Sequence, residues 1–193
     1  MLLTLANLKS RLNISNSADD SKLTDLITQV GKRFENFCDR VFERAASQVY
    51  YFDCQKVFQL KLAPVESLTL HYDIDRAFTS DTLLVANDDY VLTNATGLVR
   101  LLFQPNPEAW PDAIKATVTG GYVSAGSVPS AGQTAIPEDI TRAMLAQCEY
   151  EHKNHPEFGR QSVNMQGQSV SVAEFQLLPE VKNTLQPYKR ITI

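Results

Sequence analysis

A long apolar stripe between Ser17 and Arg44 constrains the fold of this chain more than any other feature. Its apolar side chains recur at steps of three and four residues, the spacing that places them on one face of an α-helix. The stripe consists of Leu23, Leu26, Ile27, Val30, Phe34, Phe37, Cys38 and Val41. Ser17 and Asp20 are spaced as in a variant of the capping box at a helix start. The pattern therefore predicts one amphipathic helix from Ser17 to Arg44.

This helix cannot be stable by itself. Burying an apolar side chain of this size contributes about 1.5–3 kcal/mol. Ordering the backbone costs about 1–2 kcal/mol for every residue of the helix. Only a minority of the residues lie on the stripe, so their burial does not offset the cost of ordering the whole stretch. The stripe therefore needs a packing partner, within the chain or in another copy of it.

Composition and charge restrict the class of protein. The chain has 193 residues, 44% hydrophobic and 21% charged, which fits one soluble globular domain. The net charge of −4 gives no sign of a nucleic-acid clamp, which would carry a basic stripe. Neither a secretory signal nor an apolar run long enough to span a bilayer is expected. The cysteines Cys38, Cys54 and Cys148 are then expected to be reduced thiols in a cytosolic setting.

The apolar period changes twice along the chain. A short amphipathic helix around Leu8, capped by Thr4, is expected to precede the long one. After Arg44 the period becomes two, which predicts an antiparallel sheet with one wet face. The runs that read as strands are 57–62, 68–75, 83–85, 90–93, 97–103 and 114–119. Residues 47–123 are therefore predicted to form a β-rich block of about six strands.

Helix signals return after the β-rich block. Pro137, Glu138 and Asp139 suit the first turn of a helix that is expected to end near Lys153. One face of this helix would carry Ile140, Met144, Gln147, Cys148 and Glu151. A short helix is expected between Pro179 and Gln186.

The predicted fold class is α+β. It is a small helical bundle, made of two N-terminal helices and a later helix, with an inserted antiparallel β-rich block and a flexible C-terminal arm. The whole chain is expected to be one domain. Its expected parts are a helical hairpin at 1–46, the β insertion at 47–123, the third helix at 135–155 and the C-terminal arm at 156–193.

Few residues suggest catalysis or metal binding. Cys148 and His152 have the spacing of zinc ligands on a helix, and Asp73 and Asp75 share a strand face. Solvated or core positions explain these side chains more simply, and no nucleophile motif or phosphate-binding glycine loop is present in the sequence. We therefore predict no catalytic, cofactor-binding or metal-binding residue. Two alternatives stay open: a metal-dependent hydrolase using Cys148, His152 and Asp73 or Asp75, and a DNA-packaging helper.

Two features suggest contacts with other proteins. Trp110 lies in a proline-rich loop, where it fills the junction of sheet and helices or anchors a neighbouring subunit. The stretch 156–171 has almost no apolar periodicity, and its arm could order against a partner or be an ordinary disordered tail. The apolar and aromatic residues of this arm that could contact a partner are Phe158, Phe175, Leu178 and Tyr188.

An ordered set of short motifs resembles the head–tail connector (adaptor) proteins of long-tailed phages and prophages. The motifs cover nearly the whole chain in the right order. They are Leu2-Leu3-Thr4-Leu5-Ala6-Asn7-Leu8-Lys9, Asp19-Asp20-Ser21-Lys22-Leu23, Ala63-Pro64-Val65-Glu66-Ser67-Leu68, Trp110-Pro111, Thr119-Gly120-Gly121-Tyr122, Val128-Pro129, Ile136-Pro137-Glu138-Asp139-Ile140 and Leu177-Leu178-Pro179. Shorter members of this family are almost wholly helical, so the β insertion marks a longer type.

The resemblance implies a structural virion protein without enzymatic activity. It implies a dodecameric ring of subunits between the portal and the stopper or tail-completion protein, assembled in the host bacterial cytoplasm and located at the head–tail interface. Double-stranded DNA would touch the ring only in transit, and no membrane is involved.

The subunit contacts of such a ring are predicted from the charged ends of the long helix. The acidic residues at its start oppose the helix dipole, as do the basic residues near its end. With Trp110, the predicted contact residues are Asp19, Asp20, Asp25, Arg40 and Arg44. The C-terminal arm, through Phe158, Phe175, Leu178 and Tyr188, is predicted to dock the portal.

Overall fold

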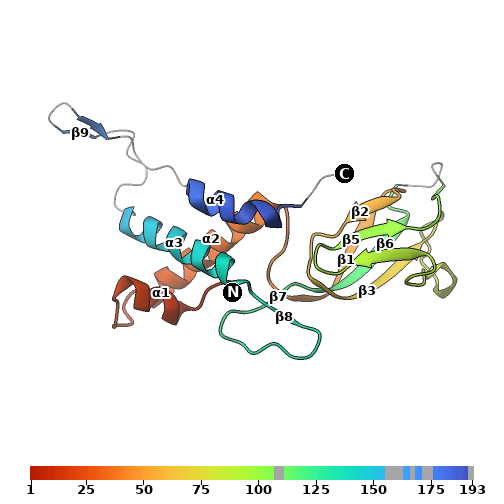
Figure 1. The fold of residues 1–193 in the computed structure, drawn as a ribbon, viewed down its shortest axis with the longest axis horizontal. Helices are drawn as coiled ribbons and strands as arrows, with labels where there is room; N and C mark the ends of the chain where they lie inside the picture. The colour runs from red at the N-terminus through yellow and green to blue at the C-terminus, as the bar shows by residue number, and fades with distance from the viewer. Residues whose placement is uncertain (107–110, 155–162, 166–167, 171–175, 191–193) are drawn as a thin grey trace. The chain divides into compact units, whose positions relative to one another are not determined.

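The chain folds into two compact units. The computed structural model describes residues 1–106, 111–154, 163–165, 168–170 and 176–190. The helical unit comprises Met1–Phe37 and Ile136–Tyr188, and the β unit comprises Cys38–Ala135 and Lys189–Ile193. Figure 1 shows the helices and the antiparallel sheets, so the α+β class is confirmed. The assignment of the whole chain to one domain with a hairpin, an insertion, a third helix and an arm stays a prediction.

The first helix of the helical unit is capped as its sequence predicts. Helix α1 spans Leu5–Leu12, and the Thr4 hydroxyl oxygen accepts a hydrogen bond of 3.1 Å from the Asn7 N–H. Asn13, with a φ of 56°, ends the helix in the left-handed region that asparagine tolerates. Helix α1 packs against α3, which spans Glu138–Asn154.

The long helix α2 spans Asp20–Cys38 and is shorter than the stripe predicts. Residues Leu23, Ile27, Val30, Phe34 and Cys38 of the stripe are fully buried. The chain leaves the helix at Asp39, whose φ of 48° is left-handed, and Val41 already pairs with Leu62 as an isolated bridge. Ser17 lies before the helix rather than at its cap. The predicted end at Arg44 was wrong, because Val41 continues the apolar spacing although the backbone has turned into the β unit.

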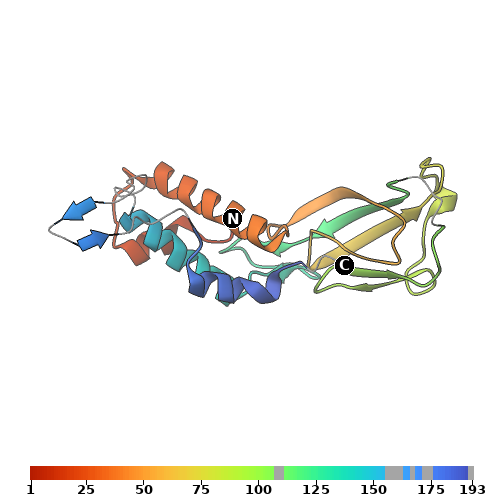
Figure 2. The same ribbon diagram turned by 90° about the horizontal axis from the view of Figure 1, so that it is seen from above.

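Helices α3 and α4 complete the helical unit. The predicted face of α3 is buried, with Ile140, Met144, Gln147, Cys148 and Glu151 all inaccessible to solvent or nearly so. Helix α4 spans Pro179–Leu185, is followed by a 3₁₀ turn at Gln186–Tyr188, and packs against α3. Figure 2 shows a hairpin that the sequence did not predict, formed by β9, Val163–Met165, and β10, Gln168–Val170.

The β unit contains two antiparallel sheets of three strands each. In the first sheet, β6 (Ile114–Gly120) lies between β1 (Ala45–Phe52) and β3 (Val65–Tyr72). In the second sheet, β5 (Leu98–Leu101) lies between β2 (Val57–Gln59) and β4 (Tyr90–Thr93). A short 3₁₀ helix, η1, covers Ser80–Thr82, and β7 (Tyr122–Val123) pairs in parallel with β8 (Thr134–Ala135).

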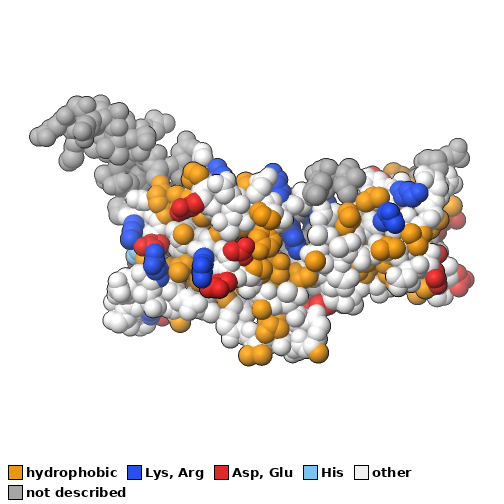
Figure 3. Space-filling model, viewed as in Figure 1, with side chains coloured by type: hydrophobic (Ala, Val, Ile, Leu, Met, Phe, Trp, Pro, Cys, Tyr) orange, Lys and Arg blue, Asp and Glu red, His pale blue; other side chains and the backbone are white. Residues whose placement is uncertain are grey.

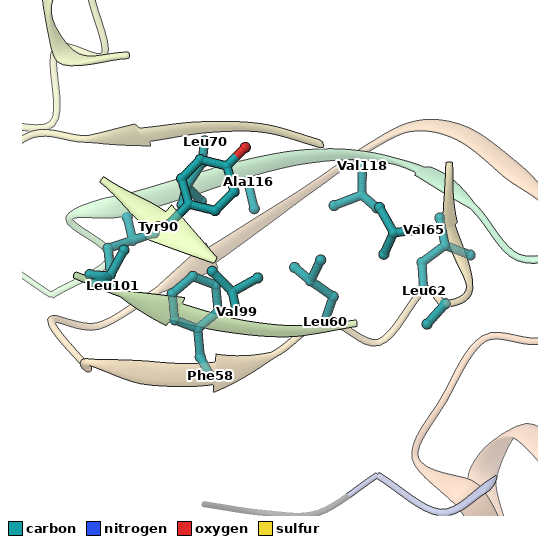
Figure 4. Packing of buried hydrophobic residues seen from close by; sticks show 12 residues of the cluster. Phe58, Leu60, Leu62, Val65, Leu70, Tyr90, Val99, Leu101, Ala116 and Val118 are labelled. Atoms are coloured by element: carbon teal, nitrogen blue, oxygen red, sulfur yellow. The ribbon is translucent and has the colours of Figure 1, made fainter. Parts of the chain in front are cut away.

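The two sheets share one hydrophobic core. Strand β6 alternates strictly, with Ile114, Ala116, Val118 and Gly120 buried. Figure 4 shows the Ala116 and Val118 side chains of β6 facing side chains of the second sheet across the interior. The labelled members of the cluster are Phe58, Leu60, Leu62, Val65, Leu70, Tyr90, Val99, Leu101, Ala116 and Val118. The period-two pattern therefore identified the core strands.

In the β unit, β1 and the pair β7–β8 were not predicted, and one predicted strand is not formed. Strand β1 was not predicted, because most of its side chains are exposed and its alternation is weak, as at the edge of a sheet. The predicted strand at 83–85 is not formed, and Leu83 makes only an isolated bridge with His71. Short apolar runs are ambiguous by periodicity alone.

A close crossing of the backbone explains why two glycines end β6. A Cβ atom on Gly120 would overlap the carbonyl oxygen of Pro64 and lie 3.0 Å from the Cα atom of Val65. The Gly121 N–H donates to the Pro64 carbonyl oxygen at 2.7 Å, and its φ of 91° suits glycine. The Gly-Gly pair is therefore a packing requirement of the β unit.

Replacing Gly120 by alanine tests this requirement. We expect Gly120→Ala to lower the free energy of unfolding by about 1–3 kcal/mol, since the added methyl group displaces backbone. Gly31→Ala on α2 is the control, because its Cβ would lie 3.6 Å from the Met144 methyl group and alanine favours a helix. Urea unfolding measures both variants. A Gly120→Ala protein as stable as wild type would contradict the crossing.

Candidate assembly surfaces

A buried polar network holds the helical unit together at the end of α3. Gln147 and Glu151 lie one turn apart and are 0% and 2% exposed. The Gln147 amide nitrogen donates to the Glu151 carboxylate at 2.7 Å and to the Gln176 carbonyl oxygen at 3.1 Å. Its amide oxygen accepts the Leu178 N–H at 2.9 Å. Arg33 of α2 donates to the other Glu151 carboxylate oxygen. We call these groups the α3 polar network.

The buried cysteines are poor metal ligands and nucleophiles. Burial, reinforced by the charge of Glu151 and opposed by Arg33, raises the pKa of Cys148 to about 12. Burial likewise raises the pKa of Cys38 to about 11, against the charges of Arg40 and Lys189. Thiolates are the reactive and metal-binding form, so both side chains are protonated at neutral pH. They act as small hydrophobic residues in the core.

The carboxylate proposed for a hydrolase instead stabilises a turn. One oxygen of Asp73 accepts the Asp75 N–H at 3.0 Å, and the other accepts the Phe78 N–H at 2.7 Å. Within the described ranges, the structure brings together no three His, Cys, Asp or Glu side chains that could hold a metal. The geometry of the described residues therefore gives the hydrolase alternative no support.

The acidic residues at the start of α2 differ in their surroundings. Asp19 pairs with Lys22 at 2.8 Å, and the hydrogen bond and charge of this lysine lower the pKa of Asp19. Asp20 pairs with Lys9 of α1 at 2.6 Å. Asp25 is exposed on the solvent side of the helix. Asp25 is thus the most exposed of these three acidic residues.

The two arginines expected at the helix end lie in the β unit. Arg40 is 7% exposed, and one of its guanidinium nitrogens donates to the Ala95 carbonyl oxygen at 3.2 Å. Arg44 makes a two-pronged pair with Glu66, at 2.8 and 2.9 Å. Both guanidinium groups therefore serve contacts inside their own chain, and their predicted role between subunits stays a prediction.

The residues predicted to dock a portal are only partly described. The Leu178 backbone belongs to the α3 polar network, and the Tyr188 hydroxyl donates to the Asp139 carboxylate at 2.8 Å. Leu177, Val181 and Leu185 are buried, so the stretch 176–188 is part of the helical unit. Phe158, Phe175 and Trp110 lie outside the described residues.

The sequence did not predict an ion pair between Arg190, near the C-terminus, and Asp39, which we call the Asp39–Arg190 clasp. Arg190 pairs with Asp39 through two guanidinium nitrogens, one at 2.8 Å, and its N–H donates to the Cys38 carbonyl oxygen at 2.8 Å. Lys61 also lies 3.2 Å from the Asp39 carboxylate. Burial alone would raise the pKa of Asp39, but hydrogen bonds from Arg190 and Lys61 and their charges lower it. The sequence shows only that two basic residues, Lys189 and Arg190, follow Tyr188.

The exposed surface offers apolar side chains and mixed charge. Val128, in the loop between β7 and β8, is 90% exposed, and Figure 3 shows hydrophobic side chains on this loop. Val49 and Tyr51 of β1 are 45% and 48% exposed. In the same view, acidic and basic side chains are interspersed over the helical unit. Among the described helices, none has the length and apolarity needed to cross a membrane.

The fold matches chains from the necks of phage-like particles. A chain from the neck of an empty gene transfer agent particle, computed with C6 symmetry, matches with a TM-score of 0.56 and 14% identity, over 100% of this chain and 91% of that one. A chain from the virion of the native particle matches with a TM-score of 0.56 and 15% identity, and the coverage of both chains is the same. A chain from the native neck, computed with C12 symmetry, matches with a TM-score of 0.53 and 13% identity. The match covers 98% of this chain and 89% of that one. No curated protein matches the sequence.

These likenesses show a shared fold, that of an α+β chain. The head completion protein family matches residues 1–191, and the chain belongs to this family. It is therefore a structural virion protein of the head–tail interface, and the resemblance noted in the sequence is confirmed at this level.

The α3 polar network can be tested by removing one or both of its charges. We expect Arg33→Met to lower the free energy of unfolding by about 3 kcal/mol, because it leaves a buried carboxylate without its cation. The Arg33 side chain is 24% exposed, which keeps the loss at the lower end of the usual range. The double variant Arg33→Met, Glu151→Leu should lose less of the free energy of unfolding than the single variant Arg33→Met. Denaturant unfolding in a double-mutant cycle measures this, and additive losses would contradict the coupling.

The Asp39–Arg190 clasp should be sensitive to acid. Folding lowers the pKa of Asp39. The contribution of Asp39 to the free energy of unfolding is therefore complete above the pKa of the unfolded state, about 3.9, and is lost as the pH falls through the pKa of the folded state. We expect Arg190→Ala to lower the free energy of unfolding by about 1 kcal/mol or less at neutral pH, since Asp39 is partly exposed. The difference from wild type should shrink as the pH falls below the unfolded value. Arg76→Ala, which removes a pair of 3.7 Å, is the control, and a difference independent of pH would refute the clasp.

Proposed function

We propose that the chain forms a closed adaptor ring between the portal and the stopper or tail-completion protein, and that the ring extends the DNA channel. The observation that carries this proposal is the fold match over the whole chain to a neck chain, within a family of head completion proteins. Twelve copies are proposed, because one of the chains with a similar fold comes from a neck that was computed with C12 symmetry. Assembly would take place in the host bacterial cytoplasm.

The charge of the chain suits a channel through which DNA passes. A cationic wall would bind phosphates through counterion release and slow the transit of a duplex. The net charge of −4 and the interspersed surface charges avoid this. Double-stranded DNA is therefore proposed as a molecule in transit rather than as a ligand.

The contacts of the ring are proposed from the residues that face solvent. Asp25 is the most suitable of the predicted charged residues, whereas Asp19, Asp20, Arg40 and Arg44 already have partners within the subunit. The other predicted interface residue is Trp110. The proposed portal-docking residues are Phe158, Phe175, Leu178 and Tyr188. Because 176–188 packs against α3, an arm deletion should be confined to residues 156–175 so that the helical unit can still fold.

Electron microscopy of the full-length chain mixed with its portal tests the proposal. We expect added ring density at the tail-facing end of the portal, with twelve-fold averages and an open centre. The portal alone and the adaptor alone are the controls. Portal particles that stay unchanged with excess adaptor would overturn the ring. Tight binding of free duplex DNA with a steep salt dependence would instead favour the DNA-packaging helper.

A further inference from the structure

One edge of the first sheet in the β unit pairs with none of the other described strands. Strand β1 pairs with β6 and with no other strand among those described. The opposite edge, β3, is covered by its own chain, since Leu84 donates to the Leu70 carbonyl oxygen at 2.8 Å and Val65 donates to the Asn94 carbonyl oxygen at 2.8 Å. The backbone of β1 is therefore the edge of this sheet that can accept another strand.

The sequence of β1 lacks the usual protection of an edge strand. Proteins discourage pairing at edges with lysine, proline, charge or a bulge. No charged residue or proline occurs in Ala45–Phe52. A bulge is present only at its start, where the φ of Ser47 is 52° and its N–H donates to the Thr119 hydroxyl at 3.0 Å. The stretch 48–52 is left regular, with Val49 and Tyr51 about half exposed.

The helical unit contains a small sheet of two strands that pairs with no other described strand. Strands β9 and β10 pair with each other, Met165 opposite Gln168 and Val163 opposite Val170, and with no other described strand. Their sequences, Val-Asn-Met and Gln-Ser-Val, contain no charge. An isolated two-stranded hairpin is marginally stable in water, so it gains from joining a larger sheet.

We propose that the β9–β10 hairpin of one subunit adds to residues 48–52 of β1 in the next subunit. The inference rests on the proposed ring and deepens it by naming a subunit contact. An added strand gains main-chain hydrogen bonds along the open edge, and neither side has to bury a charge. Each subunit gives a hairpin from its helical unit and receives one on its β unit. Two different surfaces make the head-to-tail contact from which rings are built.

Two variants block the two halves of this contact. The edge variant carries Val49→Lys and Tyr51→Lys, which place charge beside the added strand. The hairpin variant replaces residues 163–170 by glycine and serine at equal length. The matched control carries Leu83→Lys and Val85→Lys, two residues that are equally exposed outside β1. Each blocking variant should need at least about tenfold more protein to complete rings on the portal, whereas the control should resemble wild type.

Mixing the two variants gives the decisive readout. The edge variant retains a hairpin and the hairpin variant retains an edge, so one good contact remains between them. We expect native mass spectrometry to find a one-to-one pair in the mixture and monomers of each variant alone. Hydrogen exchange of wild type, which needs no variant, should show at least tenfold slower exchange in 48–52 when rings form.

The outcomes separate this contact from the ring itself. Wild-type protein that adds no ring to the portal would overturn the proposed function. Wild-type rings accompanied by normal rings of either blocking variant, or by unchanged exchange in 48–52, would overturn the hairpin–edge contact alone. A mixture without pairs, while both variants keep the wild-type melting temperature, would overturn it as well.

Discussion

The buried carboxylate of Glu151 is the constraint on which the helical unit depends. A charge removed from water must find cationic and hydrogen-bonding partners, because an unpaired one costs several kcal/mol. Arg33 and Gln147 supply these partners from α2 and α3. The apolar stripe determines which face of α2 is buried. The ion pair fixes which turn of α2 meets the end of α3.

The same network determines where the C-terminal part of the chain begins again. Gln147 binds the backbone of Gln176 and Leu178 while it contacts Glu151. The entry to α4 is thus tied to the face of α3 that ends near Asn154. Both ends of the segment that carries β9 and β10 are therefore attached to one helix.

Periodicity revealed the buried faces of this protein, and local backbone turns limited what it could reveal. The stripe of α2 and the polar residues Gln147 and Glu151 on α3 were found because burial follows the 3.6-residue repeat. The helix end was not found, because Asp39 enters the left-handed region in the middle of a continuing apolar pattern. Strand β1 was missed for the opposite reason, since an edge strand with both faces partly wet has little alternation to detect.

Candidate contact residues were harder to infer, because charge in a sequence does not say which partner it meets. Arg40 and Arg44 carry the positive charge expected of a subunit contact, yet in the fold they bind Ala95 and Glu66 of their own chain. The main-chain groups of an edge strand carry no sequence signal, although they can bind a neighbour through a row of hydrogen bonds. Side-chain identity therefore points toward charged contacts, while the topology leaves an uncharged backbone edge available. A ring built through that edge would depend on strand geometry more than on the identity of any one residue.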